Sequence, residues 1–190
     1  MDTPIDISRV TIETERLRLR AWQETDVDDL FEYASVPGVG EMAGWRHHEN
    51  KAVSQSILQS FIDEKTVFAV VLKSTQKVIG SLGLHPSWAN SNETYKDLKT
   101  KEIGYVLSKD YWGRGLMPEA VAAVIAFCFE RYALDALTCG HFTSNPQSKR
   151  VIEKCGFTFV KRSTFFAKQL QKELEDMKYI LFSTQQRSRS

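Results

Sequence analysis

The stretch Asp110–Ala120, DYWGRGLMPEA, has the pattern of a strand end, a turn with two glycines around an arginine, and the start of a helix. A helix N-terminus leaves about four backbone N–H groups unpaired and carries roughly half a positive charge, so it attracts anions. Glycine lets a ligand approach the backbone closely. The stretch therefore indicates an anion site, with an ordinary glycine-rich turn as the alternative.

The length and composition of the chain are those of one globular domain. A chain of 190 residues with 42% hydrophobic and 26% charged residues fills one core. The net charge of +1 at pH 7 gives no general attraction to nucleic acid or to a membrane surface, so any anion site is local. We expect a single domain over residues 1–183 and a flexible polar tail over residues 184–190.

Targeting signals and cysteine usage point to the cytoplasm. The chain starts without a basic end followed by an apolar run, and no segment approaches about 20 uninterrupted apolar residues. Cys128, Cys139 and Cys155 are odd in number and lack metal-type spacing. We therefore expect a cytoplasmic protein with reduced thiols and with neither a membrane anchor nor a metal.

Apolar periodicity and turn residues predict a layered α/β (α+β) fold with a mixed sheet of about seven strands. The helical patterns cover residues 26–36, 51–63, 118–133 and 146–155. The strand patterns cover residues 10–22, 66–73, 77–84, 102–108, 134–142, 157–163 and 177–182. The segment 85–101 is predicted as a polar surface loop, and 167–176 as a charged piece between the last two strands.

Two separate motifs carry a family resemblance. The stretches 105–120, YVLSKDYWGRGLMPEA, and 143–157, TSNPQSKRVIEKCGF, resemble the acyl-CoA-binding core of the GCN5-related N-acetyltransferases (GNAT), within them the Rim-type branch that acetylates N-termini of ribosomal proteins. TERLRLR (14–20) and EIGYVL (102–107) extend the similarity from Thr14 to about Phe182. The resemblance implies a GNAT fold with helices on both faces of the sheet and acetyl-CoA as the co-substrate.

The resemblance also implies where acetyl-CoA binds. Its pyrophosphate is expected at the glycine turn, where backbone amides and the charge of Arg114 face the phosphates. Trp112 and Met117 depart from the family pattern, which has Arg or Gln at the first position and Gly or Ala at the last. Asn145, at a helix N-cap, is expected to hydrogen-bond the pantetheine arm. The full expected cofactor site is Val106, Leu107, Trp112, Gly113, Arg114, Gly115, Leu116, Met117 and Asn145.

Two residues are expected to carry the proton transfers. An amine with a pKa of about 8 at a chain terminus, or about 10 on a lysine, must lose a proton before it attacks. By resemblance Glu102 is the base, directly or through water, with a solvated strand-edge glutamate as the alternative. Ile152 stands where many relatives carry a general-acid tyrosine, and Ser148 matches a Rim-type serine that serves the leaving thiolate. A plain hydroxyl on the first helical turn is the alternative for Ser148.

Trp45 and Tyr105 are the expected contacts to the acceptor substrate. Trp45 lies in the loop between the first two predicted helices, a region that relatives use for substrate selection, and pinning this loop to the core is its alternative role. His47 or His48 in the same loop could relay a proton, although surface histidines are the simpler explanation. Trp88 and Tyr95 of the polar loop could cover the site from the other side, although a packing role is the simpler explanation.

The resemblance and these residues together predict an acetyltransferase that moves an acetyl group from acetyl-CoA to a primary amine by direct attack. Cys155 lies at the far end of its helix, which argues against a covalent acetyl-enzyme. The acceptor stays open between the N-terminal amine of a ribosomal protein and a small amine such as a polyamine, amino sugar or amino acid. A non-catalytic acyl-CoA-binding module is the alternative from another class, and a homodimer is one candidate assembly.

Overall fold

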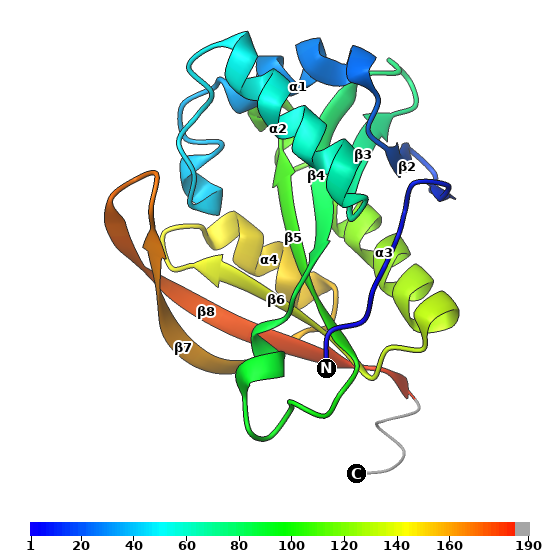
Figure 1. The fold of residues 1–190 in the computed structure, drawn as a ribbon, viewed down its shortest axis with the longest axis vertical. Helices are drawn as coiled ribbons and strands as arrows, with labels where there is room; N and C mark the ends of the chain where they lie inside the picture. Colours follow the sequence, from blue (N-terminus) through cyan, green and yellow to red (C-terminus); the bar gives the residue numbers. More distant parts are fainter. Residues whose placement is uncertain (185–190) are drawn as a thin grey trace.

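The computed structural model of the chain describes residues 1–184, and residues 185–190 of the expected tail lie outside the described part. A single mixed sheet has the strand order β1-β2-β3-β4-β5-β6-β8-β7 (Figure 1). Its strands are β1 (Thr11–Glu13), β2 (Leu17–Ala21), β3 (Val67–Leu72), β4 (Val78–His85), β5 (Thr100–Leu107), β6 (Ala136–Phe142), β7 (Thr158–Ala167) and β8 (Lys172–Phe182). The α-helices are α1 (Val27–Ala34), α2 (Lys51–Glu64), α3 (Leu116–Tyr132) and α4 (Pro146–Lys154). The predicted α/β fold with a mixed sheet is confirmed.

The strand count is eight rather than about seven, because the predicted strand 10–22 is a hairpin of two short strands. The backbone N–H of Thr14 donates to Leu17 O (2.9 Å), and Leu17 N–H donates to the Thr14 hydroxyl (2.9 Å). These bonds close a turn across which the apolar alternation changes phase, from Val10 and Ile12 to Leu17 and Leu19. The segment 167–176, predicted as a charged piece between the last two strands, is mostly part of those strands. β7 ends at Ala167, and β8 already begins at Lys172.

The sheet splits between its two central parallel strands. β5 and β6 pair only from Thr100 with Ala136 to Ile103 with Cys139. Beyond these residues β5 stays paired with β4, and β6 stays paired with β8. In Figure 1 the two strands diverge accordingly. The opening begins at Gly104 and Gly140, next to the end of β5 that leads to the glycine turn.

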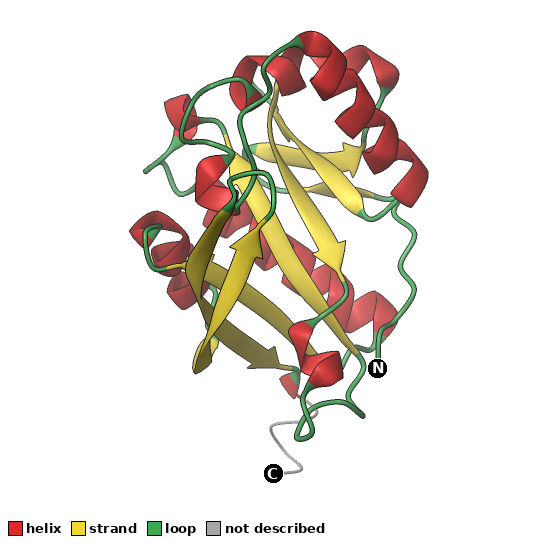
Figure 2. Cartoon of the chain, turned by 60° about the vertical axis from the view of Figure 1, so that its left-hand side comes forward, coloured by secondary structure: helices red, strands yellow, loops and turns green. Residues whose placement is uncertain are grey.

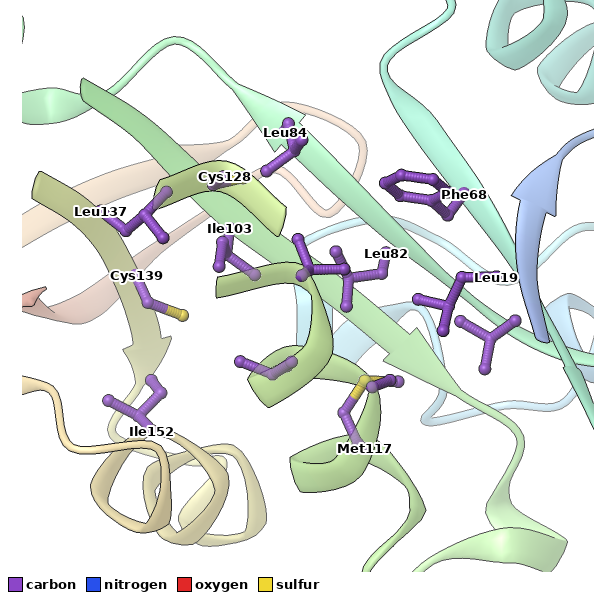
Figure 3. Packing of buried hydrophobic residues seen from close by; sticks show 14 of the residues in the cluster. Leu19, Phe68, Leu82, Leu84, Ile103, Met117, Cys128, Leu137, Cys139 and Ile152 are labelled. Atoms are coloured by element: carbon purple, nitrogen blue, oxygen red, sulfur yellow. The ribbon is translucent and has the colours of Figure 1, made fainter. Parts of the chain in front are cut away.

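Helices cover both faces of the sheet, each over its own core (Figure 2). α3 and α4 pack on the larger cluster, which includes Phe68, Leu82 and Ile103 (Figure 3). α1 and α2 pack on a smaller cluster around Trp22 and Leu58. Burial of apolar surface at about 25 cal/mol per Å² stabilises both layers. The two layers hold the diverging strands from opposite sides.

The N-terminal end of α3 is held by the TERLRLR segment. The carboxylate of Glu119 accepts hydrogen bonds from the Thr14 hydroxyl (2.6 Å), the Arg16 backbone N–H (2.9 Å) and Arg16 Nε (2.7 Å). Arg16 Nη1 also donates to the carbonyl oxygen of Arg114 (2.9 Å). Burial would raise the pKa of Glu119, but these hydrogen bonds lower it below its ordinary value. The segment therefore fixes the glycine turn against the sheet.

Candidate active site

The glycine turn has the backbone conformation that its sequence predicts. Gly113 and Gly115 have φ angles of 75° and 74°, in the left-handed region that L side chains rarely adopt. Gly115 is the N-cap of α3, and the first intrahelical bond there runs from Glu119 N–H to Gly115 O (3.3 Å). The amides that precede this bond are free for a ligand. A Cβ on Gly113 would meet no atom within 4 Å, so the turn borders open space.

A cavity of about 400 Å³ lies beside this turn, between the end of β5, the start of α3 and α4. We call it the cofactor cavity. All of the predicted cofactor residues except Arg114 line it, which are Val106, Leu107, Trp112, Gly113, Gly115, Leu116, Met117 and Asn145. Their binding roles stay predictions.

Arg114 does not line the cofactor cavity, because its guanidinium lies over the ring of Tyr111, 5.3 Å from the centroid. The cations that do line it are Arg150 and Lys154, one turn apart on α4. Sequence reasoning missed both, and their four-residue spacing beside the N-cap Asn145 was the signal that could have found them.

The two departures from the family pattern have structural explanations. Trp112 Nε1 donates to the carbonyl oxygen of Leu107 (2.7 Å), so the indole closes the turn onto β5 instead of contacting a phosphate. The side chain of Met117 is 4% exposed and belongs to the core between α3 and the sheet (Figure 3). Only the backbone of Met117 is then required at the turn.

Asn145, Ser148 and Tyr105 meet where the strands diverge. Asn145 Oδ1 accepts from Ser148 N–H (3.1 Å), as the predicted N-cap requires, and its Nδ2 donates to Met42 O (3.2 Å). The hydroxyls of Tyr105 and Ser148 are 2.8 Å apart. Burial raises the pKa of Tyr105 well above its ordinary value, so its hydroxyl keeps its proton. Ile152 is 1% exposed and belongs to the core, which excludes a proton-donating role for this position.

A second cavity, of about 690 Å³, lies on the other side of this point. We call it the acceptor cavity. Its wall on one side is apolar and comes from α1, the α1–α2 loop and α2, while its floor on β4, β5 and β8 carries polar groups. The two cavities share the lining residues Met42, Ala43, Tyr105, Val106, Asn145 and Ser148. The Tyr105–Ser148 pair therefore borders both cavities.

Glu102 is part of the floor of the acceptor cavity, on the face of β5 predicted from strand alternation. It accepts from the backbone N–H of Trp88 (3.2 Å) and lies 3.4 Å from Lys178 Nζ. Lys178 also pairs with Asp176 at 2.7 Å. Burial alone would lower the pKa of Lys178, but the two carboxylates raise it. Two carboxylates thus face one ammonium at this floor.

The aromatic and histidine residues predicted near the acceptor site differ in their positions relative to the acceptor cavity. Trp45 lines the acceptor cavity and stacks near His48, with ring centroids 5.2 Å apart. His48 is buried and its Nδ1 lies 2.7 Å from the Ser54 hydroxyl. His47 pairs with Glu41 (2.8 Å) and lines neither cavity.

Trp88 and Tyr95 pack against each other outside both cavities, 5.9 Å between centroids, as expected. His85, which the sequence analysis assigned to a surface loop, is the last residue of β4 and lines the acceptor cavity. The alternation of SLGLH was the available signal.

A mixed sheet that splits between parallel strands, beside a glycine turn and an N-capped helix, defines an acyl-CoA-dependent acyltransferase. Residues 16–158 match the family model for the acetyltransferase (GNAT) domain, and the chain belongs to this family. It is an N-acetyltransferase that uses acetyl-CoA as its co-substrate.

Relatives and solved structures agree with this assignment. The uncharacterised N-acetyltransferase p20 of Bacillus licheniformis is 27% identical over 152 residues, which are 77% of this chain and 82% of that protein. A GNAT-family acetyltransferase from Bacillus anthracis superposes with a TM-score of 0.77 at 21% identity, over 91% of this chain and 98% of that one. The ribosomal-protein-S5-alanine acetyltransferase from Vibrio fischeri superposes with a TM-score of 0.70 at 17% identity, over 92% and 97%. At these identities the two solved structures show that the chain has the GNAT fold.

The cofactor cavity fits acetyl-CoA in its chemistry. The free amides of the glycine turn and the cations of Arg150 and Lys154 suit phosphates, and the apolar side chains of Val39 and Leu107 suit the pantetheine arm. Within residues 1–184 there is no cluster of three or more His, Cys, Asp or Glu side chains that could hold a metal ion. In the same part of the chain, no helix has both the length and the apolar character to cross a membrane.

Proposed function

We propose that the protein transfers the acetyl group of acetyl-CoA directly to a primary amine bound in the acceptor cavity. The observation that carries this proposal is the shared border of the two cavities at Tyr105, Asn145 and Ser148. A thioester that reaches this border from the cofactor cavity meets an amine that reaches it from the acceptor cavity. Holding two reactants in this way supplies much of the rate of a direct transfer.

The cysteines support direct attack over a covalent acetyl-enzyme. Cys155 lines neither cavity, its thiol points to the carbonyl oxygen of Pro118 (3.7 Å), and burial raises its pKa to about 11. Cys139 is 1% exposed, and burial raises its pKa further above the ordinary value. Neither thiol forms the thiolate that a nucleophile requires.

A side chain at the shared border of the cavities, or on the floor of the acceptor cavity, serves each of the two proton transfers. The carboxylate of Glu102 draws the proton from the acceptor ammonium, directly or through an intervening group. The hydroxyl of Ser148, backed by the Tyr105 hydroxyl at 2.8 Å, donates a proton to the departing thiolate of CoA. A thiol pKa of about 8.5 means that this leaving group needs only modest help.

The lining of the acceptor cavity favours an amine that carries an apolar group. The apolar wall of Trp45, Ile57 and Phe61 suits such a group, and the carboxylates of Glu102 and Asp176 suit the ammonium. An N-terminal residue of a protein, inserted end-on, has this chemistry, and the Rim-type resemblance points to the same acceptor.

A small amine is the second candidate, because a contact between two loops closes one side of the acceptor cavity. Arg46 N–H donates to Gln169 Oε1 (3.0 Å), and Arg46 Nη2 donates to Gln169 O (3.2 Å). This contact joins the α1–α2 loop to the β7–β8 turn. A closed side leaves less room for a polypeptide to continue out of the cavity.

The proposal is tested by incubating the protein with acetyl-CoA and a panel of amines, and by measuring free thiol and acetylated product. The panel pairs short peptides that have apolar or polar first residues with small amines of the same side chains. We expect the amines with apolar groups to be acetylated, and the amount of free thiol released to equal the amount of acetylated amine. If Gln169→Ala acetylates peptides faster than the unaltered protein does, the contact between the two loops excludes long acceptors. Absence of any acetylated amine would refute the proposed function.

A further inference from the structure

We propose that His85 is the base that takes the proton from the acceptor ammonium, and that Glu102 acts on the amine through it. The proposal deepens the proposed function and rests on it. It starts from the position of His85 on β4, directly paired with Glu102 on β5 and lining the acceptor cavity. Directly paired residues on antiparallel strands have Cβ atoms about 5 Å apart on the same face of the sheet. The imidazole and the carboxylate are therefore neighbours on the cavity floor.

Two glycines make room for the imidazole. Gly83 and Gly104 are paired across the same two strands, and the ring of His85 lies over both. A Cβ on Gly83 would come within 2.3 Å of His85 Nε2, and a Cβ on Gly104 within 3.2 Å of His85 Cδ2. The ring thus lies along the floor, toward the point where β5 and β6 diverge.

The ring of His85 has one nitrogen free to accept a proton, since the other carries N–H in the neutral imidazole. Neither nitrogen has a hydrogen-bond partner among residues 1–184. The two other histidines that line the cavity are engaged. His48 Nδ1 lies 2.7 Å from the Ser54 hydroxyl, and the two nitrogens of His141 contact Phe142 O (2.9 Å) and Tyr179 OH (3.1 Å). Of the three histidines that line the cavity, His85 is therefore the one available to take a proton from a substrate.

The charge state of His85 suits a base at neutral pH. The residue is exposed and lines the cavity, and its partial desolvation lowers the pKa of its imidazole below the ordinary value. The charged groups that act on it are Glu102 and Glu64, which raise its pKa, and Lys101, which lowers it. Lys178 and Asp176 face the same cavity from β8 and are paired with each other. The imidazole is therefore mainly neutral at pH 7.

The proton balance of the reaction is complete with this residue. The ammonium gives one proton to His85, and the free amine forms a C–N bond to the thioester carbonyl carbon. The C–S bond then breaks, and the nitrogen loses its second proton. One of the two protons goes to the thiolate of CoA and the other to solvent, through the imidazolium. The carboxylate of Glu102 stabilises the imidazolium while it exists.

The test is the pH dependence of kcat/KM for the best amine of the panel, from pH 5.5 to 9.5. The variants are His85→Gln and Gly83→Ala, and the second moves the ring without removing it. The matched control is His47→Gln, a histidine outside both cavities. Acetyl-CoA binding by calorimetry checks that each variant is folded.

We expect His85→Gln to lower kcat/KM by about 100-fold at pH 7. Near the pKa of the amine, where the substrate arrives deprotonated, kcat/KM of the variant should approach that of the unaltered protein. Gly83→Ala should lower kcat/KM by a smaller factor, and its difference from the unaltered protein should also shrink at high pH. His47→Gln should have the kcat/KM of the unaltered protein. A loss of equal size at every pH, or no loss, overturns the role of His85 while the acetyl transfer stands. An unaltered protein that acetylates no amine overturns the proposed function and this inference together.

Discussion

The hydroxyls of Tyr105 and Ser148 form one donor at the border of the two cavities. Burial keeps the tyrosine protonated, and at 2.8 Å it can hand a proton to the serine or hold the serine hydroxyl in place. Ile152 is a core residue, so the position that carries tyrosine in many relatives gives no donor here. Tyr105 of β5 therefore lies beside the serine of α4, and we propose that it holds the serine hydroxyl in place.

We predict that Ser148→Ala lowers kcat by about 10- to 100-fold, because the thiolate is already a fair leaving group. Tyr105→Phe should give a smaller loss, since the serine hydroxyl remains. The measurement is turnover with two acetyl donors whose thiols differ in pKa. The donor with the lower thiol pKa should recover most of the loss, and equal defects with both donors would make Ser148 a positioning residue.

We predict that Glu102→Gln lowers turnover by about 100-fold at pH 7 and leaves acetyl-CoA binding nearly unchanged. The amide keeps the size and the bond from Trp88 N–H, but it stabilises neither an ammonium nor an imidazolium. The matched control is Glu93→Gln on the polar surface loop, whose side chain is 89% exposed. Full activity of Glu102→Gln at pH 7 would exclude the carboxylate from the proton path.

At the scale of elements, we propose that α3 and α4 together bind the anionic half of acetyl-CoA. The start of α3 supplies backbone amides, and α4 supplies the cations that line the cavity. Arg114, in the glycine turn itself, holds Tyr111 and the loop around it. In this proposal the neighbouring helix supplies the charge that the resemblance assigned to the turn.

We predict that Arg150→Ala and Lys154→Ala each weaken acetyl-CoA binding by about 1 kcal/mol or more, as charge-assisted contacts do. Arg114→Ala should cost less, because its guanidinium lies over Tyr111. Lys149→Ala is the matched control, since this lysine of α4 pairs with Glu153 (3.7 Å) outside the cavity. Calorimetry with CoA decides the order, and a larger loss for Arg114→Ala than for Arg150→Ala would contradict it.

The helices could be predicted from the sequence to within about two residues, because caps mark them. Asn145 and Pro146 at the start of α4 are an example, and their local chemistry is the same in any context. The turn between β1 and β2 was missed, although the apolar positions change from even numbers (Val10, Ile12) to odd numbers (Leu17, Leu19) across it. His85 was missed because Pro86 and the polar residues after it indicate a loop, although β4 ends at the histidine itself. The spacing of Arg150 and Lys154 places them on one face of α4, but only the fold shows that a cavity lies beside that face.

At the scale of the whole molecule, the stability of the fold depends on a contact between its first strands and α3. Glu119 holds Thr14 and Arg16, and its pKa in the folded protein is lower than the ordinary value of 4.5. A carboxyl group with a lowered folded pKa stabilises the fold fully above its unfolded pKa. The contribution is lost as the pH falls through the folded pKa. It also ties the glycine turn to the sheet.

We predict that Glu119→Gln lowers the free energy of unfolding by roughly 1.5 to 3 kcal/mol at pH 7, the range for hydrogen bonds to charged groups. The difference from the unaltered protein should shrink as the pH falls below about 4.5. Urea unfolding at several pH values measures both effects, with the exposed Glu130→Gln of α3 as the control. A difference that stays constant with pH would show that the charge of Glu119 is not involved.

The split of the sheet gives the molecule two cavities with one border, and the central claim is that acetyl-CoA and the amine occupy them together. The most direct measurement is the initial rate of acetylation with both substrates varied, together with the amounts of free thiol and acetylated amine. We predict intersecting double-reciprocal lines, because direct transfer requires both substrates to be bound at once, and equal amounts of the two products. Parallel lines would indicate a covalent acetyl-enzyme and would contradict the account.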